Sequence, residues 1–200
     1  MRELGWLDLG VVLAALAALA LVGSARPGQT PEPALALLSD QTVIVRRHDL
    51  VLEGGTLDAW QEAFQTAEYF GAFAAAPDGG YGWVAAYSTM EAARQSALAR
   101  CARRSPGCVI VAEAMPVDPV PDHSRTLRHR EAQNFQRYRT LPGAKAFAIS
   151  ENGAYGMSWR AMSPQIARRK ALANCENANE RDQTGGLPDW PCFVIHATAR

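Results

Sequence analysis

The sequence lacks a net charge, the motifs of the common catalytic sites and almost all lysine. Its 20 basic side chains balance its 20 acidic ones, so composition gives no reason to expect a nucleic acid as partner. It contains no HExxH metal motif, no GxSxG turn and no paired-carboxylate motif. We therefore predict no catalytic residue, no metal ligand and no cofactor, and these absences favour a protein that is not an enzyme.

Long apolar runs are also absent, apart from one at the N-terminus. Residues 11–22 have the length of the apolar core of an export signal, and Gly23-Ser24-Ala25 supplies small residues for cleavage after Ala25. We predict a signal peptide over residues 1–25 and a periplasmic or secreted protein. The alternative is an uncleaved inner-membrane anchor over residues 4–25, at the short limit for a bilayer core of about 30 Å. Only in that case would a membrane be a partner.

The remaining sequence contains the same unit twice. Residues 71–101 align without a gap on residues 145–175, with 12 of the 31 positions identical. The identical pairs include Ala72/Ala146, Phe73/Phe147, Gly79/Gly153, Tyr81/Tyr155, Gly82/Gly156, Arg94/Arg168 and Cys101/Cys175. Because one unit is specified twice, the alignment predicts architecture better than it predicts chemistry.

We predict an α+β fold of two tandem α-β-β-α-β repeats about a pseudo-two-fold axis, with antiparallel sheets and helices on one side. The predicted boundaries are a signal peptide at 1–25, an arm with short strands at 26–55, a first repeat at 56–114, a proline-rich connector at 115–123 and a second repeat at 124–200. Six aromatic residues of the hairpins should supply core or the seam between repeats: Phe73, Tyr81, Trp83, Phe147, Tyr155 and Trp159.

Local signals predict the elements before the first hairpin. Residues 34–38 suit a helical turn, and residues 42–45 and 49–52 suit short strands. Thr56 is the predicted N-cap of the helix that follows.

Further signals predict the ends of the later helices. Ser88 and Glu91 have the S-x-x-E form of a capping box before a helix over residues 90–103. Ser163 followed by Pro164 predicts the start of the second such helix. Residues 124–139 read as a basic helix with Leu127, Phe135 and Tyr138 on its inner face.

All four cysteines follow the predicted signal peptide. An even number of cysteines in an exported chain predicts disulfides, and the alignment pairs Cys101 with Cys108 and Cys175 with Cys192. Zinc is the competing interpretation, although neither pair has the CxxC spacing typical of zinc ligands.

A family resemblance rests on four short motifs of the first unit and their looser second copy. These are Gly-Ala-Phe-Ala, Gly-x-Tyr-Gly, Ala-x-x-x-Ala-Leu-x-x-Cys and Cys-x-Ile-Val-Ala. The chain resembles small exported bacterial proteins of unknown function, some of them labelled 5-aminolevulinic acid synthase. We do not transfer that activity, because it needs a large fold and a Schiff-base lysine for pyridoxal phosphate. The two lysines here are Lys145, which precedes a predicted strand, and Lys170.

The densest basic segment and one insertion provide the candidate binding surface. The second unit has an exit loop ten residues longer than the first, and it contains Trp190. Insertions in one copy of a repeat often mark a functional face, and clustered arginines suit an acidic polymer or lipid head groups. A solvated helix face and a tolerated insertion are the alternatives. The candidate residues are Arg125, Arg128, Arg130, Arg137, Arg139 and Trp190.

The leading functional hypothesis is an exported, non-catalytic protein that binds another protein or an envelope component. One alternative is a small periplasmic hydrolase that uses His123 or His196. Another is a carrier of a small ligand, with an apolar cleft between the two repeats.

Overall fold

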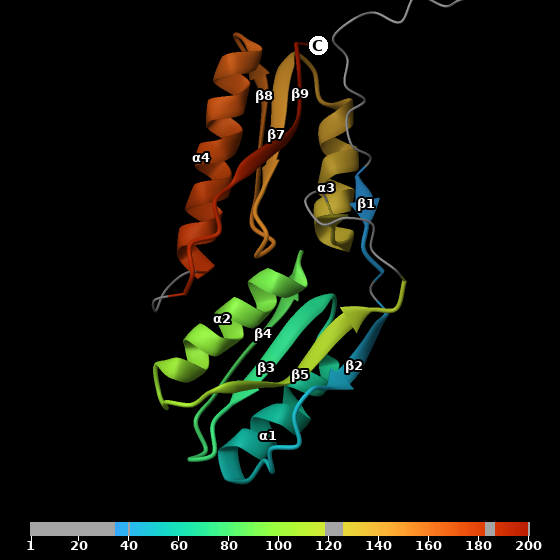
Figure 1. Cartoon of the computed structure of the whole chain (residues 1–200). Coiled ribbons are helices and arrows are strands. Elements are labelled where there is room, and N and C mark those ends of the chain that lie inside the picture. The colour runs from blue at the N-terminus through green and yellow to red at the C-terminus, as the bar shows by residue number, and fades with distance from the viewer. Residues whose placement is uncertain (1–34, 40, 119–125, 183–186, 200) are drawn as a thin grey trace, which may run out of the picture. The chain divides into compact units, whose positions relative to one another are not determined.

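The computed structural model describes residues 35–39, 41–118, 126–182 and 187–199 of the chain. The predicted signal peptide, His123 and Arg125 lie outside the described residues. The elements run in the order β1 (Ala36–Leu37), β2 (Thr42–Arg46), α1 (Gly54–Glu62), the 3-10 helix η1 (Phe64–Thr66), β3 (Phe70–Ala75), β4 (Tyr81–Tyr87), α2 (Met90–Ala102), β5 (Val109–Pro116), β6 (Thr126–Leu127), α3 (His129–Thr140), β7 (Ala144–Ile149), β8 (Tyr155–Ala161), α4 (Pro164–Asp182) and β9 (Phe193–Thr198) (Figure 1).

The strands form separate antiparallel sheets, which confirms the predicted α+β class. The first sheet has the order β2-β5-β3-β4, and the second has the order β8-β7-β9. A short parallel pair joins β1 to β6. We call residues 42–118 the first half and residues 126–199 the second half.

Helices cover both faces of each sheet, so the prediction of helices on one side is wrong. In the first half α2 packs on Ala72 and Ala74 of β3, whereas α1 and η1 pack on Phe73 from the other face (Figure 1). In the second half α4 and α3 take the same two places. The reason is that both strands are almost wholly buried: alanines fill one face and a phenylalanine lies on the other, and the one charged residue, Lys145 of β7, is bonded to α3.

Helices α2 and α4 lie close to their sheets because the contact residues are small. A Cβ built on Gly82 of β4 would lie 2.3 Å from the backbone nitrogen of Cys101, and one on Gly156 of β8 would lie 2.3 Å from that of Cys175. Each glycine thus leaves the space that the helix backbone occupies. The same close approach of helix to glycine occurs in both halves.

The hairpin strands and the helix that follows them lie at a constant offset in the two halves. Strands β3 and β7, strands β4 and β8, and helices α2 and α4 each begin 74 positions apart. Ala86 and Arg160, also 74 apart, both have positive φ, 60° and 51°. The duplication itself and the pseudo-two-fold axis stay interpretations.

Both predicted disulfides are present and confirm the pairing from the alignment. Cys101 bonds Cys108 with an S–S distance of 2.00 Å, and Cys175 bonds Cys192 at 2.05 Å. Each bond joins a central helix to the start of the closing strand. Within the described residues, no helix has the length and apolar character to cross a membrane.

Three predicted features at the start of the chain are wrong. Residues 36–37 form strand β1 rather than a helical turn, and residues 49–52 are irregular rather than a strand. Helix α1 begins at Gly54, so Thr56 lies within it, and its hydroxyl donates to the carbonyl of Gly79 at 2.7 Å instead of capping. Contacts distant in sequence decide all three.

The predicted start of α4 is confirmed, and the predicted N-cap of α2 is wrong. Ser163 Oγ accepts from the Ile166 amide at 3.3 Å, and α4 begins at Pro164, as predicted. The N-cap of α2 is Thr89, whose hydroxyl accepts from the Ala92 amide at 3.2 Å, so the predicted Ser88–Glu91 box is wrong. The reason is that the Ser88 backbone bonds the second half.

Candidate functional site at the junction of the halves

Backbone hydrogen bonds join the β4–α2 loop of the first half to the β7–β8 turn of the second. The Ser88 amide donates to the carbonyl of Glu151 at 2.8 Å, and the Ser88 carbonyl accepts from the Thr126 hydroxyl at 2.8 Å. The Thr89 hydroxyl donates to Glu151 Oε2 at 3.2 Å. A single loop therefore contacts two separate segments of the second half.

Arg128 binds both halves with one guanidinium group. It donates to the Ala86 carbonyl of the first half, to the Gly153 carbonyl of the second at 2.6 Å, and to Glu131 Oε2 at 2.7 Å. Glu131 is buried, and it also accepts from the Arg128 amide at 3.0 Å, so its carboxylate satisfies the backbone N–H at the start of α3. This arginine is therefore occupied in holding the junction together.

Trp190, from the loop that is longer in the second half, packs against the core of the first half. Its indole N–H donates to Ser96 Oγ at 3.1 Å, and Ser96 on α2 is fully buried. Its carbonyl accepts from Ser150 and from Asn179, each at 2.6 Å. The insertion thus places a hydrogen-bonded indole at the junction.

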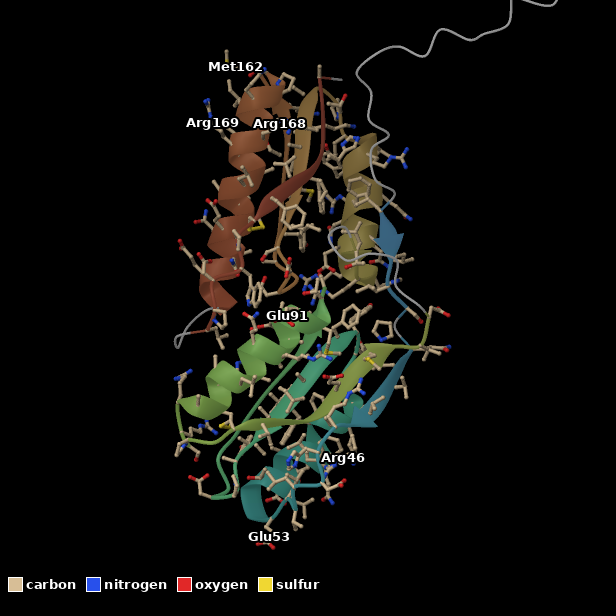
Figure 2. The ribbon with its side chains drawn as sticks, viewed as in Figure 1. Arg46, Glu53, Glu91, Met162, Arg168 and Arg169 are labelled. Carbon is tan, nitrogen blue, oxygen red and sulfur yellow. A yellow bond between two sulfur atoms is a disulfide. The ribbon has the colours of Figure 1, made fainter. Side chains whose placement is uncertain are left out.

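A cavity of about 610 Å³ opens beside these contacts. Its apolar walls come from β3, α2 and β5, and its polar wall includes Glu151 of the second half. The apolar lining is Phe70, Met90, Met115 and Pro116, and the polar lining is Ser88, Thr89, Glu91, Arg94, Asp118 and Glu151. Figure 2 labels Glu91 at the start of α2.

The one basic side chain of this lining already has a carboxylate partner, Glu113, which it shares with Arg47. Arg94 Nε lies 2.6 Å from Glu113 Oε1, and Arg47 Nε lies 2.7 Å from Glu113 Oε2. Burial tends to raise the pKa of Glu113, but hydrogen bonds from the two arginines outweigh it and hold the pKa below its ordinary value. The same hydrogen bond raises the pKa of Arg94. The carboxylates of Glu91, Asp118 and Glu151 consequently give the cavity a negative character.

The structure describes four of the five arginines of the predicted surface. Arg128 is at the junction, and Arg130, Arg137 and Arg139 are exposed at different turns of α3, whose inner side carries Phe135 and Tyr138. Leu127, predicted on that helix, lies in β6. Trp190 is half-buried at the junction with the first half.

His196 lies among aromatic rings. Its Nδ1 is 2.9 Å from the Tyr138 hydroxyl, and its ring meets those of Phe135 and Tyr138 edge to face. This is the surrounding of a partly buried histidine with a hydrogen-bond partner. The described residues contain no group of three or more His, Cys, Asp or Glu side chains that suits a metal ion.

The sequence pattern places Lys145 before a strand. In the structure it lies within β7. Its buried ammonium group donates to the carbonyls of Arg139 at 2.5 Å and Leu141 at 2.7 Å. These carbonyls belong to the C-terminal end of α3, where a cation is favourable. The lysine therefore fastens α3 to the sheet.

Sequence reasoning missed the residues that surround the cavity. Glu113 carries a signal in hindsight, because it is the one charged residue in an otherwise apolar strand, Val109–Pro116. Such a residue needs a partner of opposite charge when it is buried. Glu151 carries no such signal, because it occupies an ordinary turn.

Comparison with known proteins adds no relative: no family model, no curated protein and no solved structure matches this chain.

Proposed function

We propose that this chain is an exported, non-catalytic binding protein whose junction cavity receives a basic segment of a partner protein. The observation that carries the proposal is the cavity lining, in which apolar walls adjoin three carboxylates while Arg94 is paired with Glu113. A lysine or arginine side chain has an apolar stem and a cationic head, so it complements such a lining. Met90 and Met115 add side chains that adapt to irregular shapes.

Export is supported by the two disulfides together with the predicted signal peptide. Disulfides form and persist in oxidising compartments and are rare in the cytosol. The constant offset between the hairpins and helices of the two halves supports a duplicated unit. Interfaces between domains are a common location for binding sites.

A carrier of a small cationic ligand is the second candidate. The cavity volume, about 610 Å³, falls within the usual range of small-molecule sites. A free polyamine has the same cationic chemistry as a basic peptide segment but lacks its apolar neighbours.

The test is the anisotropy of a labelled peptide of alternating lysine and leucine, titrated with the full chain. We expect the double variant E91Q/E151Q to weaken binding about tenfold, because two of the three carboxylates are neutralised. The matched control E62Q neutralises an exposed carboxylate of α1 and should leave binding unchanged.

Equal loss in the variant and the control would overturn the proposal, as would binding that neither change affects. Displacement of the peptide by spermidine at equal concentration would favour the carrier over the partner protein.

A further inference from the structure

One end of the second half exposes six basic side chains. They come from the last turns of α3, the end of β8 and the first two turns of α4. We call this group the basic end: Arg137, Arg139, Arg160, Arg168, Arg169 and Lys170, all exposed. Figure 2 labels Arg168 and Arg169 near the start of α4.

Contacts within the second half bring these segments together. The Arg160 amide donates to the carbonyl of Pro142 at 3.2 Å, which joins the end of β8 to the loop after α3. Lys145 bonds the last carbonyls of α3, and Ala144 pairs with Ala161 in the sheet. Because α4 begins three residues after β8 ends, its first turns lie at the same end.

The basic end has no acidic counterpart nearby in the sequence. Between residues 137 and 175 the one carboxylate is Glu151, and Glu151 lies in the turn that contacts the first half. Among the described residues, no ion pair involves any of the six cations.

The first half shows how this charge would be neutralised in a folded core. Arg94, which corresponds to Arg168, pairs with Glu113. Strand β9 carries Ala197 where β5 carries Glu113, since Ala197 faces Ala146 as Glu113 faces Ala72. The second half has kept the arginine and has no carboxylate at the position that would balance it.

An exposed apolar side chain lies beside these cations. Met162, between β8 and α4, is 94% exposed, and Trp159 is 43% exposed. Met162 corresponds to Ser88, which is buried at the junction of the halves. Singly exposed apolar residues are common on protein surfaces, so Met162 supports a partner only together with the cations beside it.

We propose that the basic end binds the surface of an anionic lipid bilayer. The six cations would lie at the phosphate level, where each basic side chain near the surface contributes about 1 kcal/mol. Met162 would enter the interfacial layer, as apolar residues next to cations do in peripheral membrane proteins. A soluble acidic polymer would be attracted by the charge alone and would make no use of Met162. This surface is separate from the junction cavity, so the two proposals stand or fall independently.

The test is sedimentation of the full chain with phosphatidylglycerol-containing vesicles and with pure phosphatidylcholine vesicles. The ratio of the two partition coefficients isolates the charge-dependent binding from any contribution of the apolar N-terminal segment. We expect R168Q/R169Q to lower that ratio about 30-fold, from about 1 kcal/mol for each of two charges. The control R103Q/R104Q removes two adjacent exposed arginines after α2 and should change the ratio less than twofold.

A second variant tests the apolar contact. M162S introduces the residue of the first half, leaves the charge unchanged and should weaken binding to the anionic vesicles about fivefold. An unchanged vesicle ratio in R168Q/R169Q, with folding verified by circular dichroism, would overturn the proposal. Polyphosphate binding as tight as vesicle binding and insensitive to M162S would also overturn it, in favour of a soluble acidic polymer.

Discussion

The two halves share a scaffold and differ in what surrounds it. In both, a phenylalanine of the first hairpin strand stacks on a tyrosine of the second, Phe73 on Tyr81 at 6.0 Å and Phe147 on Tyr155 at 5.8 Å. In both, a helix side chain bonds the same carbonyl of the edge strand, Arg100 to Trp83 and Asn174 to Met157.

The differences lie at corresponding loops and strands. The β4–α2 loop of the first half is buried against the second half at Ser88, whereas the β8–α4 loop exposes Met162. Strand β5 carries Glu113 between two arginines, and β9 carries Ala197. The first half therefore uses this loop to join the halves, and the second half exposes the corresponding loop.

The largest expected change in stability tests the close approach of helix to sheet that both halves share. Replacing Gly82 or Gly156 by alanine should lower the free energy of unfolding by about 3 kcal/mol in either half, because the new Cβ would overlap the helix backbone. Denaturant unfolding of the two variants measures this. The control G55A places a methyl group where no atom lies within 4 Å and should be close to neutral.

A large loss in one glycine variant alone would show that the halves do not depend on the same close approach. In that case the correspondence of backbone positions would not extend to the energetics of packing.

Local features of the fold could be predicted from the sequence, whereas contacts between distant segments could not. The hairpins, central helices, closing strands and disulfide pairing followed from the alignment, because each signal was local and present twice. The N-cap of α2 was misassigned to Ser88, since its backbone bonds Glu151 from a distant segment. The contacts of Arg128 were missed for the same reason, because nothing near it in sequence reveals the Ala86 and Gly153 carbonyls.

A smaller effect is expected at the buried carboxylate, where the halves differ. E113Q should lower the free energy of unfolding at neutral pH by about 2 kcal/mol, because it leaves two arginines without their partner. The effect is less than for a fully buried pair, since both arginine side chains are 42% exposed.

The pH dependence of stability tests the same carboxylate. The folded pKa of Glu113 lies below its ordinary value of 4.5, so its contribution is present above that value and is lost as pH falls through the folded pKa. We expect the parent to lose stability between about pH 5 and pH 3 more steeply than E113Q. Equal slopes in thermal unfolding would contradict the assignment. The reciprocal variant A197E should bring acid sensitivity to the second half.

The smallest expected effect concerns the contact that joins the unequal halves. W190F keeps the packed ring but removes the indole N–H, which leaves the buried Ser96 hydroxyl without this donor. The loss should be about 1 kcal/mol in denaturant unfolding followed by circular dichroism. The control W159F changes an exposed ring and should cost less than about 0.5 kcal/mol. A loss no greater in W190F than in W159F would mean that the longer loop does not stabilise the junction, and its ten extra residues would then need another explanation.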